Sequence, residues 1–381
     1  MEDIYLDYNA TTPVREEVLE IMNRVARDCY ANPSSIHFPG RRAKTVMDES
    51  RETIANVLGV KPSEIIFTSG GTESDNLAVA GIALGRPAGH VITSAIEHPA
   101  VLETCRSLEK RGYSLTLIPV DRSGRVDPAA VEAAIREDTC LISIMWANNE
   151  TGVVQPVGEI GKIAHEHGLP FFSDAVQAFG KIPLDLSDGA VDMLSLSGHK
   201  IYAPKGIGAL YIRRKIRPAA LIQGGGQEKN LRSGTENVPG IAALAEACRL
   251  VVEEQTEEMR RLAALRDAFE SRVLSEIPKV WVNGREAERI PNTSSLTFAG
   301  TESEAVLVGL DEFGIAASSA SACSASHADP SHVLRAMGLT RDQAEATIRF
   351  SFGRLSRTAQ IDKVLDVLAL IVRRLRALTD Y

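Results

Sequence analysis

Lys200 and Asp174 are the two residues that first suggest chemistry in this sequence. Lys200 closes residues 191–200, whose apolar first half predicts a buried strand that ends at Ser197. A partly desolvated lysine at the mouth of such a strand can lose its proton and attack a carbonyl carbon. Asp174 ends a second apolar run, residues 170–174. Either residue alone is more typical of ordinary surface structure, but together they match a pyridoxal phosphate site, where a carboxylate keeps the pyridine nitrogen protonated.

Other polar residues also fall directly after predicted strands. We expect strands over residues 65–68, 90–94, 114–119, 140–145, 171–174, 191–196 and 206–212. Helical patterns separate them, which predicts an α/β fold with a mainly parallel sheet, helices on both faces and ligands at the carboxyl ends of the strands. The polar residues that follow these strands are Thr72, His98, Asn149, Asp174, Gln177 and Lys200.

Two of these positions have specific chemical interpretations. The turn Gly70-Gly71-Thr72 leads into a helix, and the N–H groups of a helix start can hold an anion where glycines permit close approach. By itself, such a turn is also an ordinary strand-to-helix connection. The flat ring of His98 can stack on an aromatic cofactor, although a lone histidine is more often structural.

A second, smaller α+β domain is expected towards the C-terminus. A long amphipathic helical region over residues 241–274 leads to strands near 280–282 and 293–298 and to helices over 302–313 and 358–378. We therefore expect a large domain over residues 15–258. Residues 1–14 and 259–381 would form the small domain, which carries Cys323.

The cysteine and the two arginines of this region are candidate reactive groups. Residues 316–328 contain nothing larger than a histidine, so the thiol of Cys323 is expected to be exposed. Residues 348–354 predict a strand flanked by Arg349 and Arg354, and either guanidinium could clamp a substrate carboxylate. A surface ion pair is the alternative, for Arg354 in particular.

Composition excludes several classes of function. The 42 basic and 50 acidic residues give a net charge of −8 without a basic tract, which argues against direct nucleic-acid binding. The acidic N-terminus lacks a signal-peptide pattern, and no apolar run approaches the length of a membrane span. Five scattered cysteines without a Cys-x-x-Cys pair argue against a disulfide framework or a metal site and favour a cytoplasmic protein.

With these residues in view, the sequence resembles the cysteine desulfurases of the NifS/IscS type, pyridoxal phosphate enzymes of the aspartate aminotransferase fold (fold type I, class V aminotransferases). The resemblance runs nearly end to end. The stretches that carry it are 6–12 (LDYNATT), 32–37 (NPSSIH), 68–74 (TSGGTES), 97–98 (EH), 148–150 (NNE), 174–177 (DAVQ), 197–200 (SGHK), 232–237 (RSGTEN) and 319–324 (SASACS). The last is the most specific, because general aminotransferases have no such cysteine loop.

The resemblance implies pyridoxal 5'-phosphate as the cofactor and assigns three catalytic residues. Lys200 would carry the cofactor covalently and remove the substrate Cα proton, His98 would stack on the ring and move protons, and Cys323 would attack the substrate sulfur. The implied cofactor-binding residues are Gly71, Thr72, His98, Asn149, Asp174, Gln177, Ser197, His199, Lys200 and, from the other subunit of a homodimer, Thr235. Arg349 would bind the substrate carboxylate, with Asn149 also contacting the substrate.

The implied reaction converts L-cysteine to L-alanine, with the sulfur held as a persulfide on Cys323 for iron–sulfur cluster assembly or thio-modification. The sequence leaves the acceptor open among nitrogenase clusters, general clusters, tRNA thiolation and other thio-modification. A transaminase or β-lyase would share Lys200 and Asp174 without needing Cys323. A selenocysteine lyase would use the same residues, and a non-catalytic scaffold would be expected to lack the lysine or the cysteine.

Overall fold

A computed structural model describes residues 3–86, 88–187, 189–319 and 329–378. The described residues form a seven-stranded, a four-stranded and a two-stranded sheet. In spatial order, the large sheet contains β2 (Ile65–Thr68), β8 (Gly208–Ile212), β7 (Met193–Ser197), β6 (Phe171–Asp174), β5 (Thr139–Ser143), β3 (His90–Ser94) and β4 (Ser114–Ile118). Strands β7, β6, β5, β3 and β4 pair in parallel, while β8 is antiparallel to both its neighbours. The expected mainly parallel sheet is confirmed.

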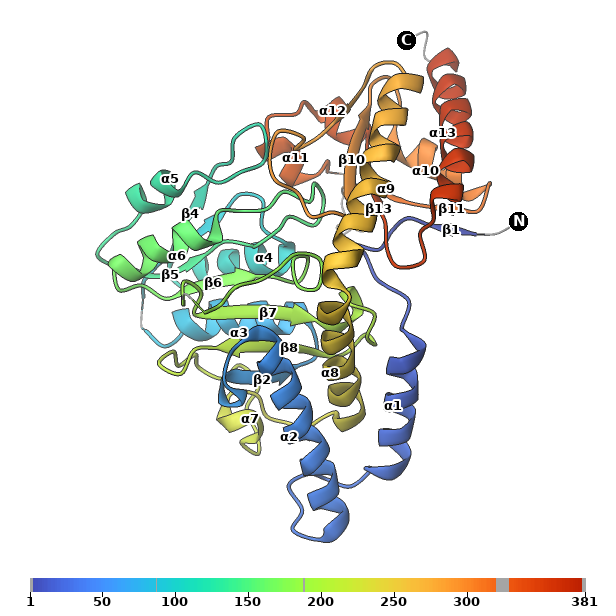
Figure 1. Cartoon of the computed structure of the whole chain (residues 1–381). Helices are drawn as coiled ribbons and strands as arrows, with labels where there is room; N and C mark the ends of the chain where they lie inside the picture. The colour runs from blue at the N-terminus through green and yellow to red at the C-terminus, as the bar shows by residue number, and fades with distance from the viewer. Residues whose placement is uncertain (1–2, 87, 188, 320–328, 379–381) are drawn as a thin grey trace.

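Helices cover both faces of this sheet (Figure 1). The two-residue periodicity of the strands explains why: Ile65 and Phe67 pack into one hydrophobic cluster, and Ile66 between them packs into another. The helices of this part are α1 (Glu16–Asp28), α2 (Phe38–Leu58), α3 (Gly71–Ala83), α4 (Pro99–Glu109), α5 (Pro128–Ala133), α6 (Val157–Glu166), α7 (Gln227–Asn230) and α8 (Val238–Glu253), with 3-10 turns η1 (Pro62–Glu64) and η2 (Gly198–Lys200). Helices α3 and α4 contribute to the cluster around Ile66, and α2, α6 and α8 to the other.

Helix α9 (Gln255–Glu276) leads from the part of the molecule with the large sheet to the part with the two smaller sheets (Figure 1). The four-stranded sheet has the order β12 (Ser318–Ser319), β13 (Thr347–Ser351), β10 (Thr293–Phe298) and β9 (Val280–Val282), and β1 (Ile4–Tyr5) pairs with β11 (Ile315–Ala316). The remaining helices are α10 (Ser303–Asp311), α11 (His332–Ala336), α12 (Arg341–Glu345) and α13 (Thr358–Leu378). Strands β1, β9, β10, β11 and β13 share a separate core with helices α9, α10 and α13, and this core includes Ile4, Leu296 and Leu365. Helices α11 and α12 pack into another small cluster, with Ile96 and Met145.

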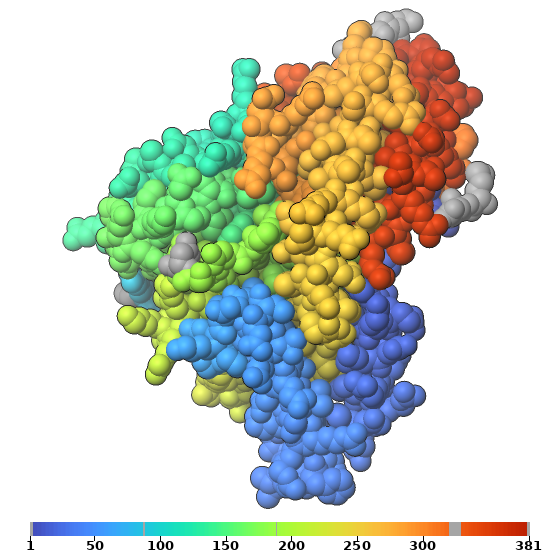
Figure 2. Space-filling model, in the orientation of Figure 1, coloured from blue at the N-terminus to red at the C-terminus, as the bar shows by residue number. Residues whose placement is uncertain are grey.

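The helical region expected over residues 241–274 consists of two helices, α8 and α9, which meet at Glu254. The two helices run along one face of the molecule from the large sheet to the small ones (Figure 2). Met259 of α9 packs against the hydrophobic cluster of the large sheet that contains Ile65, and Leu262 lies in the core of the smaller sheets. Helix α9 therefore contacts both cores. The domain division at residue 258 stays a prediction. In the described part of the chain, no helix has the length and apolar character that a membrane span requires.

Candidate active site

Lys200 ends the short turn η2 directly after β7, at the carboxyl edge of the large sheet. Its Nζ donates hydrogen bonds to the main-chain oxygens of Asn9 at 2.7 Å and Ala10 at 2.8 Å. The N-terminal segment therefore lies against the lysine. The predicted placement of Lys200 at a strand end is confirmed.

A cavity opens around Lys200 and brings together most of the predicted residues. Those that line it are Gly71, Thr72, His98, Asn149, Asp174, Gln177, Ser197, His199, Lys200 and Arg349. Four further residues that the sequence interpretation missed line it as well: Asn9, Asp75, Met145 and Val176. Thr235 is not among the lining residues, and Cys323 lies outside the described residues.

Asp174, the last residue of β6, offers a buried carboxylate to this cavity. Its Oδ1 accepts hydrogen bonds from the Val176 N–H at 2.9 Å and the Ser195 hydroxyl at 3.4 Å. Burial raises the pKa of this carboxyl group, while hydrogen bonds and the charge of Lys200 act in the opposite direction. Such a group gains from a cationic partner, because a buried negative charge without one is costly. A protonated pyridine nitrogen fits this need.

A second part of the cavity lining, here called its phosphate end, suits a phosphate. Gly70 and Gly71 lead into α3, and Thr72, Ser197 and His199 line the same region. A Cβ on Gly71 would lie 2.9 Å from Cγ2 of Val176, so any larger residue there would force Val176 to shift. The main-chain N–H groups at the start of this 13-residue helix favour an anion, and the hydroxyls of the neighbouring residues add donors. The cavity thus fits both ends of pyridoxal phosphate.

His98 caps the start of α4, where its Nδ1 accepts a hydrogen bond from the Ala100 N–H at 3.1 Å. Burial, and then the charge of Lys200, lower the pKa of this imidazole to about 4. The ring is therefore neutral at pH 7. Because Nδ1 is an acceptor, the proton is on Nε2. A neutral ring suits stacking on an aromatic cofactor better than a buried cation would.

Arg349 lies inside β13, not at its flank as the sequence had suggested, and its side chain is 2% exposed. Its Nη1 donates to the main-chain oxygen of Asn149 at 3.1 Å, and its Nη2 pairs with Asp7 at 2.8 Å. Its Nε has no hydrogen-bond partner within the described residues. A buried donor without a partner, in a residue that lines the cavity, suits an incoming carboxylate.

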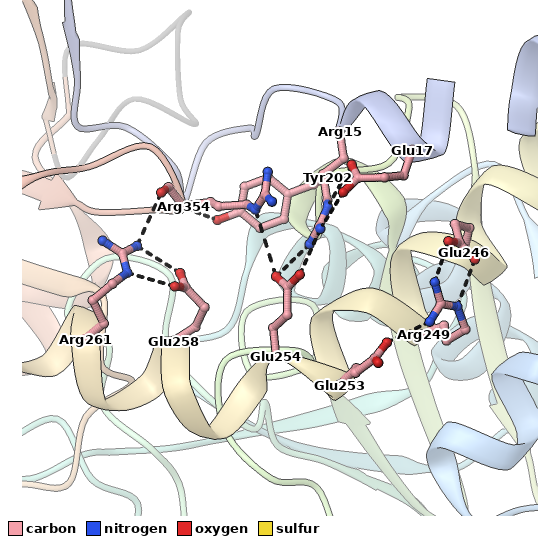
Figure 3. Close-up of polar contacts among 10 residues, drawn as sticks. All are labelled: Arg15, Glu17, Tyr202, Glu246, Arg249, Glu253, Glu254, Glu258, Arg261 and Arg354. Carbon is pink, nitrogen blue, oxygen red and sulfur yellow. Dashed lines mark hydrogen bonds and ion pairs between the residues drawn. The ribbon is translucent and has the colours of Figure 1, made fainter. Parts of the chain in front are cut away.

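Arg354 has different partners. Figure 3 shows its side chain directed towards Glu254, which also binds Arg15. The Arg354 Nε lies 3.9 Å from a Glu254 oxygen, and the Arg15 Nη1 lies 2.7 Å from that oxygen. Arg354 does not line the cofactor cavity. The geometry therefore favours Arg349 as the carboxylate ligand.

Thr235 lies on the surface, in the glycine-rich loop that follows β8. Two ion pairs hold this loop against helices α2 and α3. Arg51 and Glu228 form a buried pair at 2.6 Å, and Arg232 binds Glu73 at 2.8 Å, in the first turn of α3. The loop is thus anchored beside the phosphate end of the cavity, and Thr235 within it is exposed.

Of the missed residues, Asn9 makes the most contacts. Its main-chain oxygen accepts from Lys200 and from Gln177 Nε2, and its side-chain Nδ2 donates to the Asn149 main-chain oxygen at 3.1 Å. No periodicity marks a residue in an irregular N-terminal segment, so only the LDYNATT motif could have identified it. Asp75 was missed because it lies inside α3. Burial and the neighbouring Asp174 raise its pKa well above the ordinary value.

Within the described ranges, no group of three or more His, Cys, Asp or Glu side chains could hold a metal ion. The four described cysteines, Cys29, Cys105, Cys140 and Cys248, are buried free thiols.

Comparisons with known proteins agree with this geometry. The family described as "Aminotransferase class-V" matches residues 4–364. "Cysteine desulfurase IscS" of Dictyoglomus turgidum is 47% identical over 381 residues, covering 100% of this chain and 97% of that protein. A solved structure titled "NIFS-LIKE PROTEIN" superposes with a TM-score of 0.91 at 38% identity, covering 98% of this chain and 100% of the other.

A second solved structure, "SspA in complex with cysteine", superposes with a TM-score of 0.82 at 41% identity and covers 92% of this chain and 98% of that one. The family match over residues 4–364 includes all three sheets and the residues that line the cavity around Lys200. The fold is thus the expected fold type I of pyridoxal phosphate enzymes. The chain belongs to the class-V aminotransferase family, and within it to the NifS/IscS-type cysteine desulfurases, which depend on pyridoxal phosphate.

Proposed function

We propose that this protein converts L-cysteine to L-alanine and keeps the sulfur as a persulfide on Cys323. The observation that carries this proposal is the single cavity that combines a strand-end lysine, a buried carboxylate and a buried arginine, in a chain whose full-length relatives are named cysteine desulfurases. The solved relative "SspA in complex with cysteine" supports the choice of amino acid.

Each site residue then has a defined task. Pyridoxal phosphate, when bound, supplies an electron sink that makes the substrate Cα–H bond acidic. Lys200 anchors it and accepts the Cα proton at Nζ. Asp174 offers its carboxylate to the ring nitrogen, and Gln177 offers an amide N–H to the ring oxygen.

The remaining contacts orient the reactants. Gly71, Thr72, Ser197 and His199 hold the phosphate, and Arg349 holds the substrate carboxylate next to Asn149. His98 stacks on the ring and moves a proton through Nε2. With these contacts in place, the substrate sulfur is held at one position over the ring.

The sulfur step belongs to Cys323. The Cys323 sulfur attacks the sulfur of L-cysteine, so an S–S bond forms while the Cβ–S bond breaks. The Cβ atom keeps the electron pair of the broken bond and takes a proton to become the methyl group of L-alanine. Atoms and electrons balance without an external oxidant, because the sulfur that joins Cys323 is the one that alanine loses.

We also propose a homodimer in which Thr235 serves the cofactor of the partner subunit. Thr235 is exposed and does not line its own cavity, although its loop is anchored next to the phosphate end by Arg232 and Glu73. A surface threonine in such a loop is available to a second copy of the chain.

The sulfur would pass to an iron–sulfur scaffold or to a thio-modification acceptor, as the IscS names of relatives suggest. We place the protein in the cytoplasm, because buried free thiols such as Cys105 and Cys248 fit a reducing compartment.

The test is incubation of the purified, cofactor-loaded protein with L-cysteine. We expect equal amounts of L-alanine and reducible sulfur. A β-lyase would instead release pyruvate and ammonia, and a transaminase would require an added keto acid. Either result would overturn the proposed activity. L-selenocysteine tested in parallel would show whether the lyase activity extends to selenium.

A further inference from the structure

Lys181 is a second lysine beside the site, and the reaction as proposed gives it no task. It lies in the turn that follows β6, where its N–H donates to the Ala178 main-chain oxygen. Its Nζ donates one hydrogen bond to Gln177 Oε1 at 2.5 Å and another to Asn9 Oδ1 at 3.0 Å. Both acceptors belong to residues that line the cofactor cavity.

These two bonds determine which way the amide of Gln177 faces. A lysine amine donates to Gln177, so the oxygen of the amide must face Lys181 and the NH₂ group must face away. The Gln177 Nε2 accordingly donates to the Asn9 main-chain oxygen at 2.9 Å. An amide NH₂ carries two N–H groups, and this bond uses one. The second is available to an acceptor in the cavity.

Asn9 is fixed by the same amine. Its Oδ1 accepts from Lys181 and from Asn292 Nδ2, each at 3.0 Å, and its Nδ2 donates to Thr293 at 2.7 Å. A flipped Asn9 amide would place its NH₂ group against two donors. The Asn9 main-chain oxygen also accepts a hydrogen bond from Lys200, so the position of Asn9 also affects where the amine of Lys200 is held.

The environment of Lys181 suits a neutral amine. Burial is the main cause that lowers its pKa well below the ordinary value, and the charges of Lys200 and Arg349 add to it. A neutral lysine amine carries two N–H groups, and the two bonds to Gln177 and Asn9 use both. The amine therefore serves as a pair of donors.

We propose that Lys181 is a positioning residue that holds the amide of Gln177 with its NH₂ group towards the cofactor, so that Gln177 donates to the ring oxygen. This inference rests on the proposed function, since it requires the cofactor. It adds a residue that touches neither cofactor nor substrate and acts through Gln177.

The test compares Lys181→Met, Gln177→Ala and the double variant as apo proteins reloaded with pyridoxal phosphate. Lys181→Met keeps the length of the side chain and removes the donors. We expect it to weaken cofactor binding about tenfold, the equivalent of one hydrogen bond, and to displace the visible absorbance maximum. In the Gln177→Ala background, Lys181→Met should change the dissociation constant by less than about twofold, because coupled residues are not additive. The matched control is Lys205→Met, a change of the same kind at an exposed lysine.

Two results would overturn the proposal. One is an unchanged absorbance maximum and cofactor affinity in Lys181→Met. The other is a loss of cofactor affinity on Lys181→Met that is equally large in the wild-type and Gln177→Ala backgrounds. If thermal denaturation shows that Lys181→Met does not fold, Gln177→Glu replaces it. Its carboxylate still accepts from Lys181 but offers the cavity no N–H, so a wild-type spectrum in this variant would also contradict the inference. Failure of the wild-type protein to bind pyridoxal phosphate would instead refute the proposed function, which keeps the two failures distinct.

Discussion

The guanidinium of Arg349 is held in place by Asp7, whose Oδ1 lies 2.8 Å from Nη2. The second terminal nitrogen, Nη1, is held by the main-chain oxygen of Asn149. Arg349 therefore keeps one orientation before any substrate arrives, which lowers the entropy cost of binding a carboxylate.

Arg349→Ala should raise the KM for L-cysteine about tenfold to a hundredfold, because a hydrogen bond to a charged group contributes about 1.5–3 kcal/mol. The spectrum of the bound cofactor should not change. Steady-state kinetics and absorbance spectra measure both. Arg354→Ala is the matched control and should leave KM near the wild-type value. If the two arginines exchanged these effects, the carboxylate would bind at Arg354.

Lys200→Ala should abolish turnover and remove the visible absorbance band of the covalently bound cofactor. Within the described residues no other lysine lines the cofactor cavity, and the nearby amine of Lys181 is engaged by Gln177 and Asn9, so we expect no other amine to replace that of Lys200. Absorbance spectra after reloading with pyridoxal phosphate provide the measurement. Lys205→Ala, at an exposed site five residues later, should behave as wild type. A band that persisted in Lys200→Ala would point to a different anchor.

Cys323→Ala should still bind the cofactor and L-cysteine but accumulate no protein persulfide. Mass spectrometry after a single turnover detects the added sulfur. Cys105→Ala serves as the control, because Cys105 is buried and burial raises the pKa of its thiol to about 12, so little of it is thiolate at pH 7. Full sulfur release by Cys323→Ala would make that thiol structural.

Thr235→Ala should weaken cofactor binding about tenfold if its hydroxyl donates to the phosphate of the partner subunit. Sedimentation should show a dimer for the wild-type protein. Activity that persisted in a monomeric fraction would contradict the shared site.

The contribution of Glu97 to stability should fall as the pH rises from about 4.5 to about 8. This carboxyl group is fully buried, and burial raises its pKa from 4.5 to about 8. The folded protein therefore binds a proton that the unfolded chain has already released in this pH range, so folding loses free energy as the pH increases. Its Oε1 accepts from Ser94 and from the Met145 N–H, while Oε2 has no partner in the described residues.

Glu97→Gln preserves the shape and the acceptor of the neutral acid. The free energy of unfolding of this variant should therefore decrease less steeply with pH than that of the wild-type protein over the same range. Urea denaturation at several pH values measures the two slopes. Parallel curves would show that Glu97 is ionised in the folded protein.

Much of the large sheet and its site could be predicted because the information is local. Strands β6 and β7 are short apolar runs. Asp174 is the last residue of β6, and Lys200 ends the short turn that directly follows β7. Parallel strands bring their carboxyl ends together, so residues more than twenty positions apart were expected to meet.

The part that escaped prediction depends on contacts between distant segments. Arg349 was expected at a strand flank, yet only the antiparallel pairing of β13 with β10 places it in the sheet and over the cavity. Asn9 and Lys181 carry no local pattern, because their importance comes from hydrogen bonds that join an N-terminal loop to the turn after β6. Helices α11 and α12 are five residues each, too short for a helical periodicity to appear.

The pairing of β1 with β11 has a consequence for the order of events during synthesis. Ile4 is in register with Ile315, and Asp7 bridges to Ser351, so the segment that presents Asn9 to Lys200 has no strand partner until residues 315–316 have been made, and its bridge forms only after residue 351. A nascent chain of 300 residues would already contain Lys200 and Asp174 but would lack the strands that hold the N-terminal segment against them. The cofactor should therefore be captured late, after nearly the whole chain has been made.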